Sequence, residues 1–134
     1  SVVGFLPTVG GEAVTLERVA GWIFAPIAWL MGIPWAEAST AGSLLGVKSV
    51  LNEFIAFIQL SSMPVNSLSE HSRLITIYAL AGFANLASIG IQISGIGTMA
   101  PERRKDLADL AWPAFVAATL ASCMTGCVVG IVAG

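Results

Sequence analysis

GSLLGVKSVLNEFIAF, residues 42–57, decides the fold of this chain because it carries two charges inside a membrane-length apolar run. The other charged residues lie in polar connectors or at the edges of apolar runs, whereas Lys48 and Glu53 lie deep inside one. An ionised side chain at bilayer depth is costly, so it is expected to face a partner or a water-filled cavity and to mark a binding or transport path.

Gly42 and Gly46 begin this stretch with the spacing GxxxG, and polar residues follow them. Glycines and polar residues that interrupt an apolar segment are typical of broken or re-entrant membrane helices, whose bare backbone is tolerated only beside protein or water. We therefore predict a helical hairpin that enters the bilayer and carries Glu53 deep within the membrane.

The composition places the whole chain in the membrane class. Of 134 residues, 56% are hydrophobic and 10% are charged, whereas soluble domains have about a quarter charged residues. The polar side chains are too few to cover a soluble globule, so we expect a multi-pass integral protein of the plasma (inner) membrane in contact with lipid. The net charge of −2 offers no basic surface, so nucleic acid is not expected as a partner.

Cys123 and Cys127 are four residues apart, so on a helix they share a face where a disulfide is geometrically poor and a metal would lack ligands. We expect them to pack as small apolar groups. Ser1 begins the chain without a basic segment ahead of an apolar core, so no signal peptide is expected. Whether the chain is a fragment of a longer protein stays open.

Residues 16–35 are predicted to form a helix at the membrane interface, since tryptophan prefers the headgroup level and the segment contains Trp22, Trp29 and Trp35. Pro26 is expected to kink this helix and Pro34 to end it. A tilted membrane span is the alternative. Residues 1–15 are Gly-rich and are interpreted as a connector.

Residues 36–60 contain the predicted hairpin, with a turn within residues 45–52, where polar and small residues cluster: Gly46, Lys48 and Ser49. One straight span of the same length is the alternative. Lys48 is expected to cap carbonyl groups at the tip of the hairpin or to reach an interface. Residues 61–73 are rich in serine and predict a loop in which His71 is solvated, neither a ligand nor a base.

Residues 74–99 are long enough to span a bilayer, yet they contain Gly82, Gly90, Gly95 and Gly97. On a helix, Asn85, Ser88 and Gln92 would form a single polar stripe. The stripe either binds a neighbouring helix in lipid or belongs to a helix unwound near its middle, whose free backbone groups meet a solute.

Residues 100–109 carry the basic cluster Arg103, Arg104 and Lys105 and are expected to be cytoplasmic, which places residues 61–73 outside. Residues 107–133 are predicted to be the closing transmembrane helix. Small residues recur along it at every fourth position and allow close approach of another helix: Ala114, Ala118, Ser122, Gly126, Gly130 and Gly134.

Three segments, GWIFAPIAWLMGIPW (21–35), LNEFIAF (51–57) and GFANLASIGIQISGIG (82–97), resemble in order and spacing the C-terminal half of a concentrative nucleoside transporter. The resemblance covers residues 15–134. It implies an all-α membrane protein made of an interfacial helix, a re-entrant helical hairpin, a broken transmembrane helix and a closing transmembrane helix.

The resemblance also implies a function, cation-coupled nucleoside uptake by symport with sodium ions or protons. The Asn-Glu-Phe motif of the family's hairpin is matched by Asn52–Phe54, and Phe-x-Asn-x-x-Ser of its broken helix by Phe83–Ser88. By that match Glu53, Asn85 and Ser88 would hold the ribose and Phe83 would lie along the base. Ile58 is a further candidate for contact with the base.

This assignment agrees with elementary chemistry. Ribose offers two adjacent hydroxyl donors, an ionised carboxylate accepts both, and an amide can donate and accept. A site built for hydroxyls also rejects analogues that lack them, because its own polar atoms would stay unpaired.

The family's sodium ligands and its first repeat have no counterpart here, so the resemblance implies a missing N-terminal half. This chain is expected to hold no metal and no other cofactor, and the family's assembly implies a homotrimer. A gate-type channel-like or structural membrane protein without nucleoside transport is the alternative function. An enzyme is not expected, because Lys48 and Glu53, five residues apart on a helix, point about 140° from each other.

Overall fold

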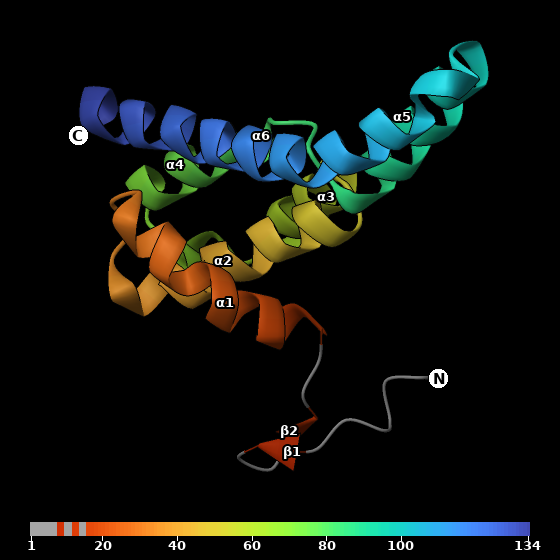
Figure 1. Ribbon diagram of the computed structural model, residues 1–134. Coiled ribbons are helices and arrows are strands. Elements are labelled where there is room, and N and C mark those ends of the chain that lie inside the picture. The colour runs from red at the N-terminus through yellow and green to blue at the C-terminus, as the bar shows by residue number, and fades with distance from the viewer. Residues whose placement is uncertain (1–7, 10–11, 14–15) are drawn as a thin grey trace.

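The computed structural model describes residues 8–9, 12–13 and 16–134, and most of these are helical (Figure 1). The connector expected over residues 1–15 lies mostly outside the described residues; the described part pairs Thr8 with Ala13 in a short antiparallel ribbon. The elements are β1 (Thr8–Val9), β2 (Glu12–Ala13), α1 (Leu16–Leu30), α2 (Trp35–Val50), α3 (Glu53–Ser62), η2 (Val65–Ser67), α4 (Glu70–Leu80), α5 (Leu86–Met99), η3 (Pro101–Arg103) and α6 (Arg104–Ala133).

Helices α1 and α2 fold back on each other, with a bend of 119° between them. The chain turns at Gly32, whose φ of +99° suits glycine, and Pro34 precedes the first turn of α2. A Cβ atom built on Gly46 would lie 2.1 Å from the Cβ of Ala20. A Cβ on Gly42 would lie 2.8 Å from backbone atoms of α1. The GxxxG spacing thus allows close packing of α1 on α2.

The helical course is interrupted at residues 51–52, inside the range predicted for the turn, so no single helix runs through residues 36–60. The residues expected to form that turn do not do so. Gly46, Lys48 and Ser49 lie within α2 and are buried. The interruption consists of Leu51 and Asn52. The side chain of Asn52 caps α3, the next helix.

Residues 61–73 are less of a loop than predicted. Helix α3 extends to Ser62, η2 follows, and α4 already begins at Glu70, so His71 lies in a helix and is partly exposed. Ser69 caps α4 by accepting a hydrogen bond from the Ser72 amide at 3.3 Å. The Glu37 carboxylate accepts a hydrogen bond of 3.1 Å from the Ser69 amide, which ties the start of α2 to the start of α4.

A second interruption separates α4 from α5 at residues 81–85. Both helices pack on α6, which runs along one side of the molecule (Figure 1). The small-residue ladder of α6 serves this contact, since a Cβ on Gly130 would lie 2.9 Å from the Ile75 side chain of α4. The core lies between α1, α2 and α4, where the fully buried apolar residues include Ala28, Leu44, Ile75 and Leu80.

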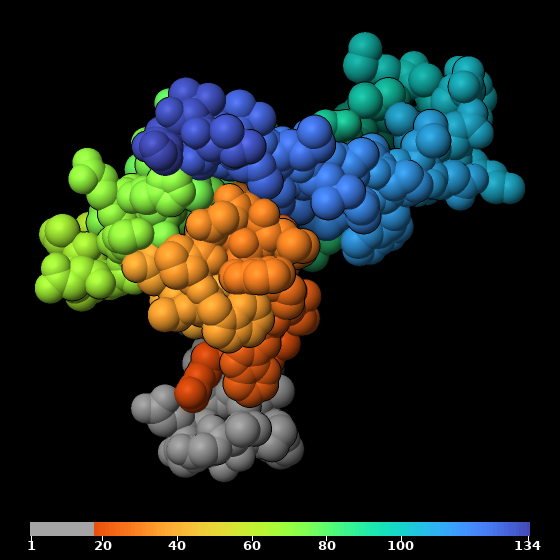
Figure 2. Space-filling view, turned by 90° about the vertical axis from the view of Figure 1, so that its left-hand side faces the viewer, coloured from red at the N-terminus to blue at the C-terminus, as the bar shows by residue number. Residues whose placement is uncertain are grey.

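Residues 101–133, which comprise η3 and α6, are the part of the described chain that is long and apolar enough to cross a membrane as one helix, with a mean hydropathy of 2.1. Only 17% of the most apolar stretch is buried inside the chain. Figure 2 shows α6 as a ridge across the upper face, with α5 projecting away from the body of the molecule.

Candidate functional site

Two asparagines begin the two helices that follow the chain's interruptions. The Asn52 Oδ1 atom accepts a hydrogen bond from the Ile55 amide at 2.9 Å, at the start of α3. The Asn85 Oδ1 atom accepts one from the Ser88 amide at 2.8 Å, at the start of α5. The first amides of a helix lack partners within it, and an asparagine in extended conformation supplies one. The local sequence therefore determines where both helices begin.

The two helix starts meet through their polar side chains. Asn85 Nδ2 lies 3.4 Å from Glu53 Oε2, although the residues are 32 positions apart in the sequence. Asn85 is only 6% exposed, and Glu53, in the first turn of α3, is partly exposed. The Glu53 carboxyl group therefore lies at the positive end of the α3 dipole. At 3.4 Å the contact is long, so both groups retain hydrogen-bonding capacity for a ligand.

Ser88 completes this polar group from one turn into α5. Its hydroxyl lies 3.0 Å from Asn85 Oδ1 and 3.2 Å from the Phe83 carbonyl, and it donates to one of them at a time. Asn85 Nδ2 also lies 3.2 Å from the Phe83 carbonyl. These contacts hold the non-helical segment 83–85 against the start of α5.

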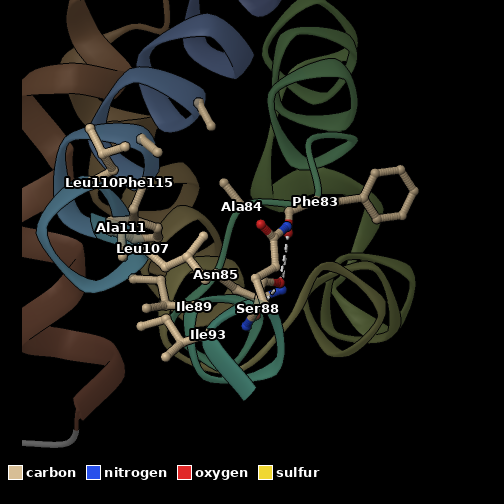
Figure 3. A pocket seen from close by; sticks show the side chains of 13 residues that line it. Phe83, Ala84, Asn85, Ser88, Ile89, Ile93, Leu107, Leu110, Ala111 and Phe115 are labelled. Carbon is tan, nitrogen blue, oxygen red and sulfur yellow. Dashed lines mark hydrogen bonds between the residues drawn. The ribbon is translucent and has the colours of Figure 1, made fainter. Parts of the chain in front are cut away.

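A cavity of about 450 Å³ lies between α5 and α6 (Figure 3). The polar residues of the predicted stripe, Asn85, Ser88 and Gln92, line it together. The wall supplied by α6 is apolar and consists of Leu107, Leu110, Ala111, Ala114, Phe115 and Ala118. The cavity thus combines a few polar groups on one side with an apolar surface on the other, as small-molecule sites do.

The structure brings Glu53, Asn85 and Ser88 together, whereas the side chains of the two residues predicted to contact a base are exposed. Phe83 lines the cavity, yet its ring points away from the apolar wall (Figure 3) and is 77% exposed. Ile58 is 48% exposed on α3 and does not line the cavity. Glu53 is not among the lining residues either and joins the site through Asn85.

Lys48 donates to a carbonyl group, as expected, but that carbonyl belongs to α4 and not to the tip of the hairpin. Its side chain is 1% exposed, and its Nζ atom lies 3.2 Å from the Ala79 carbonyl of α4, far along the chain from the hairpin tip where it was expected. One feature of the sequence indicates that Lys48 is buried, namely its position inside an apolar run. Within the described ranges, no group of three or more His, Cys, Asp or Glu residues could hold a metal ion.

Comparison with known proteins shows what the chain is similar to. The family model described as "Na+ dependent nucleoside transporter C-terminus" matches residues 1–130. The uncharacterized transporter YutK of Bacillus subtilis is 43% identical over 91% of this chain and 30% of its own length. The nucleoside permease NupC of Helicobacter pylori is 36% identical over 92% of this chain and 30% of its own length. Human solute carrier family 28 member 3 is 36% identical over 88% of this chain and 19% of its own length.

Solved structures agree with this picture. CNTnw in an inward-facing substrate-bound state is 44% identical and superimposes with a TM-score of 0.79 over 87% of this chain and 29% of its own. A CNTnw N149L structure described as intermediate 3 gives 43% identity and a TM-score of 0.82 over 88% of this chain and 30% of its own. This chain therefore spans less than a third of the length of these relatives.

Proposed function

This chain belongs to the family of Na⁺-dependent nucleoside transporters, and we propose that it supplies the ribose-contacting half of the substrate site in a cation-coupled nucleoside uptake protein. The family consists of membrane transporters and not of enzymes, so the site is interpreted as one that binds and releases its ligand unchanged. The predicted resemblance to this family is confirmed by the match over residues 1–130.

One contact carries the proposal, the approach of Asn85 Nδ2 to Glu53 Oε2 at 3.4 Å between two capped helix starts. A carboxylate beside an amide can accept from one ribose hydroxyl and serve a second through the amide. Because hydrogen bonds to an ionised group are stronger than neutral ones, the ionised Glu53 would supply most of the sugar's binding energy. Ser88, within 3.0 Å of Asn85, would complete the ribose contacts.

Phe83 and Ile58 are proposed as contacts of the base. Both side chains are exposed in the chain by itself, and an exposed aromatic ring beside the polar group offers a face on which a base can stack. The Phe83 ring points away from the apolar wall of the cavity (Figure 3) and Ile58 does not line the cavity, which supports a substrate that lies on the Glu53 side of Asn85. The cavity then receives either the sugar's edge or a packing side chain from the rest of the protein.

The helices are proposed to take four roles in the membrane. Residues 16–35 would lie at the interface, with Trp22 and Trp29 about half exposed and available to the headgroups. Residues 36–60 would form the re-entrant hairpin, residues 74–99 the broken transmembrane helix, and residues 107–133 the closing transmembrane helix. The interruptions before Glu53 and Leu86 support the second and third roles, since helix ends at membrane depth are tolerated where they face a solute.

The remaining parts of the activity are proposed to reside outside this chain. Its relatives are more than three times as long, so a further N-terminal half would supply the other side of the site and the ligands of the coupling sodium ion or proton. We propose a homotrimer in the plasma (inner) membrane as the working assembly. No cofactor other than the coupling ion is proposed.

Uptake of tritiated uridine and adenosine by the full-length protein, with and without sodium, tests the proposal. Glu53→Gln and Asn85→Ala should each reduce uptake by about 10- to 100-fold, the effect of losing a hydrogen bond to a charged group. Glu102→Gln, at an exposed site in η3, is the matched control and should leave uptake unchanged. Near-normal uptake in either site variant would remove the assignment, and absence of nucleoside-dependent flux would favour a gate-type function.

A further inference from the structure

Lys48 is the largest of the fully buried side chains, and the proposed substrate contacts do not use it. Its ammonium group donates a hydrogen bond to the Ala79 carbonyl at 3.2 Å. The two residues are 31 positions apart in the sequence, so the bond joins α2 to α4. A buried charge is retained only where partners compensate for the loss of water. In this structure the Ala79 carbonyl is the hydrogen-bond partner that compensates the buried ammonium group of Lys48.

The acceptor lies at the end of α4, next to the second interruption. The last four carbonyl groups of a helix have no helical partner, and the helix dipole gives this end negative character. The amide of Ala81 bonds back to Ile77 and Tyr78, so the Ala79 carbonyl is left for another donor. Lys48 supplies that donor and places a positive charge where the end of α4 favours it.

The space around the ammonium group leaves little freedom. A Cβ atom built on Gly82 would lie 3.2 Å from Lys48 Nζ and 1.8 Å from Ser122 Oγ. The ammonium group thus lies where α2, the start of the interruption and α6 meet. Glycine at position 82 suits this approach, because a side chain there would force the side chain of Ser122 or Lys48 to move.

The segment between α4 and α5 is therefore held at both ends by residues that flank the first interruption. Lys48, near the end of α2, holds Ala79, and Glu53, at the start of α3, contacts Asn85. We propose that Lys48 is a positioning residue which sets where the α4–α5 interruption lies, and through it the approach of Asn85 to Glu53. With 1% exposure, it acts through this geometry and not by touching the nucleoside.

This role of Lys48 rests on the proposed function, and it predicts an effect on the binding of the ribose hydroxyl groups. If Lys48 is lost, Asn85 and Glu53 no longer share one approach to the ribose, so affinity that depends on the hydroxyl groups falls. The affinity for an analogue without those hydroxyl groups should change little, because the analogue does not make these hydrogen bonds. A purely structural role for Lys48 would instead lower the amount of folded protein and leave the relative affinities of the two ligands unchanged.

The experiment is competition binding on the purified full-length transporter in sodium buffer, with tritiated uridine as the probe. Unlabelled uridine and 2′,3′-dideoxyuridine are the competitors. Lys48→Met keeps the chain length but removes the donor, and Lys105→Met, at an exposed site in α6, is the matched control. Lys48→Met should weaken uridine binding by about tenfold, the loss of a well-placed hydrogen bond, and dideoxyuridine binding by less than about twofold.

Gly82→Ala should also disturb the contact of Lys48 with the end of α4, because its Cβ atom would lie 3.2 Å from Lys48 Nζ. This variant tests the inference if Lys48→Met does not accumulate as folded protein. It should shift the ratio of the two affinities in the same direction, whereas Lys105→Met should keep the wild-type ratio. A wild-type ratio in folded Lys48→Met, or in Gly82→Ala, would overturn the inference while leaving the proposed function standing. If the wild-type protein binds adenosine and not uridine, the same competition is run with adenosine and 2′,3′-dideoxyadenosine; failure to bind either nucleoside would instead count against the proposed function, and with it the inference.

Discussion

The two polar atoms of the Asn85 side chain make different contacts. Oδ1 caps α5 by accepting from the Ser88 amide at 2.8 Å, and Nδ2 lies 3.4 Å from the Glu53 carboxylate. In the proposed site, helix stability and ligand binding would therefore depend on different atoms of Asn85. Substitutions that keep one atom's role and remove the other can separate the two contributions.

Asn85→Ser should make that separation. Serine caps a helix about as well as asparagine, so the thermal unfolding midpoint should change little. Its hydroxyl is too short to retain both contacts, so uridine uptake by the full-length protein should fall about 10- to 100-fold. Asn85→Ala should lose uptake and also about 1 kcal/mol of stability.

Ser69→Ala gives the opposite pattern and serves as the control. It removes the cap of α4, where Ser69 accepts from the Ser72 amide, and should cost about 1 kcal/mol. The KM for uridine should stay at the wild-type value. If Asn85→Ser lowered the thermal unfolding midpoint as well as uridine uptake, the residue would act through the stability of α5 alone.

At the scale of helices, small residues decide which elements come close. Gly46 lies against Ala20 at the α1–α2 contact, and Gly126 lies against α4, where a Cβ would be 3.1 Å from the Ile75 carbonyl. Contacts of this kind depend on the absence of side-chain atoms, and packing without voids or overlap resists the insertion of even one methyl group. Glycines in open positions have no such role.

Gly46→Ala should therefore destabilise the full-length protein by about 1–3 kcal/mol, seen as a lower midpoint of thermal unfolding in detergent. The added Cβ would lie 2.1 Å from the Ala20 Cβ, so adding Ala20→Gly should restore part of the loss. Gly95→Ala in α5, where nothing lies within 4 Å, is the control and should be neutral or stabilising. An unchanged midpoint in Gly46→Ala would contradict the tight α1–α2 contact.

The sequence predicted the interruptions better than the contacts between them. Asn52 and Asn85 are strong helix starters inside apolar runs, so both positions were identifiable from local chemistry alone. The matched family motifs, and not periodicity, led to the pairing of Glu53 with Asn85 as one site.

The errors concern residues whose role is set by distant partners. Lys48 and Gly46 were expected at a turn because charge and glycine are common there, but tertiary packing against α4 and α1 keeps both in α2. No local pattern reveals an acceptor 31 residues away. The ring of Phe83, directed away from the cavity, is a further feature that the spacing of its motif did not contain.

At the scale of the whole molecule, α6 can be compared in length with the thickness of a bilayer. Its 30 residues extend about 45 Å, more than the hydrocarbon thickness of about 30 Å, so its charged first turns can remain in water. Its exposed surface is apolar through Leu110, Val116, Leu120, Met124, Val128 and Ile131. Such a surface suits lipid or the apolar helices of the remaining protein.

The distribution of basic residues then predicts an orientation that labelling can test. Arg103, Arg104 and Lys105 precede the apolar part of α6 and should lie in the cytoplasm, which places Asn66, in η2 between α3 and α4, on the outer side. In the full-length protein, Asn66→Cys should react with a membrane-impermeant maleimide in intact cells. Lys105→Cys should react only after permeabilisation.

The native thiols should not interfere with this test, because Cys123 is 7% exposed and Cys127 is partly buried in the apolar part of α6. The unsubstituted protein, labelled in parallel, measures any signal from them. Reaction of both introduced cysteines in intact cells would mean that α4 and α5 together do not cross the membrane. The proposed site at Glu53 and Asn85 would then lack the water-excluding environment that makes a carboxylate selective for hydroxyl groups.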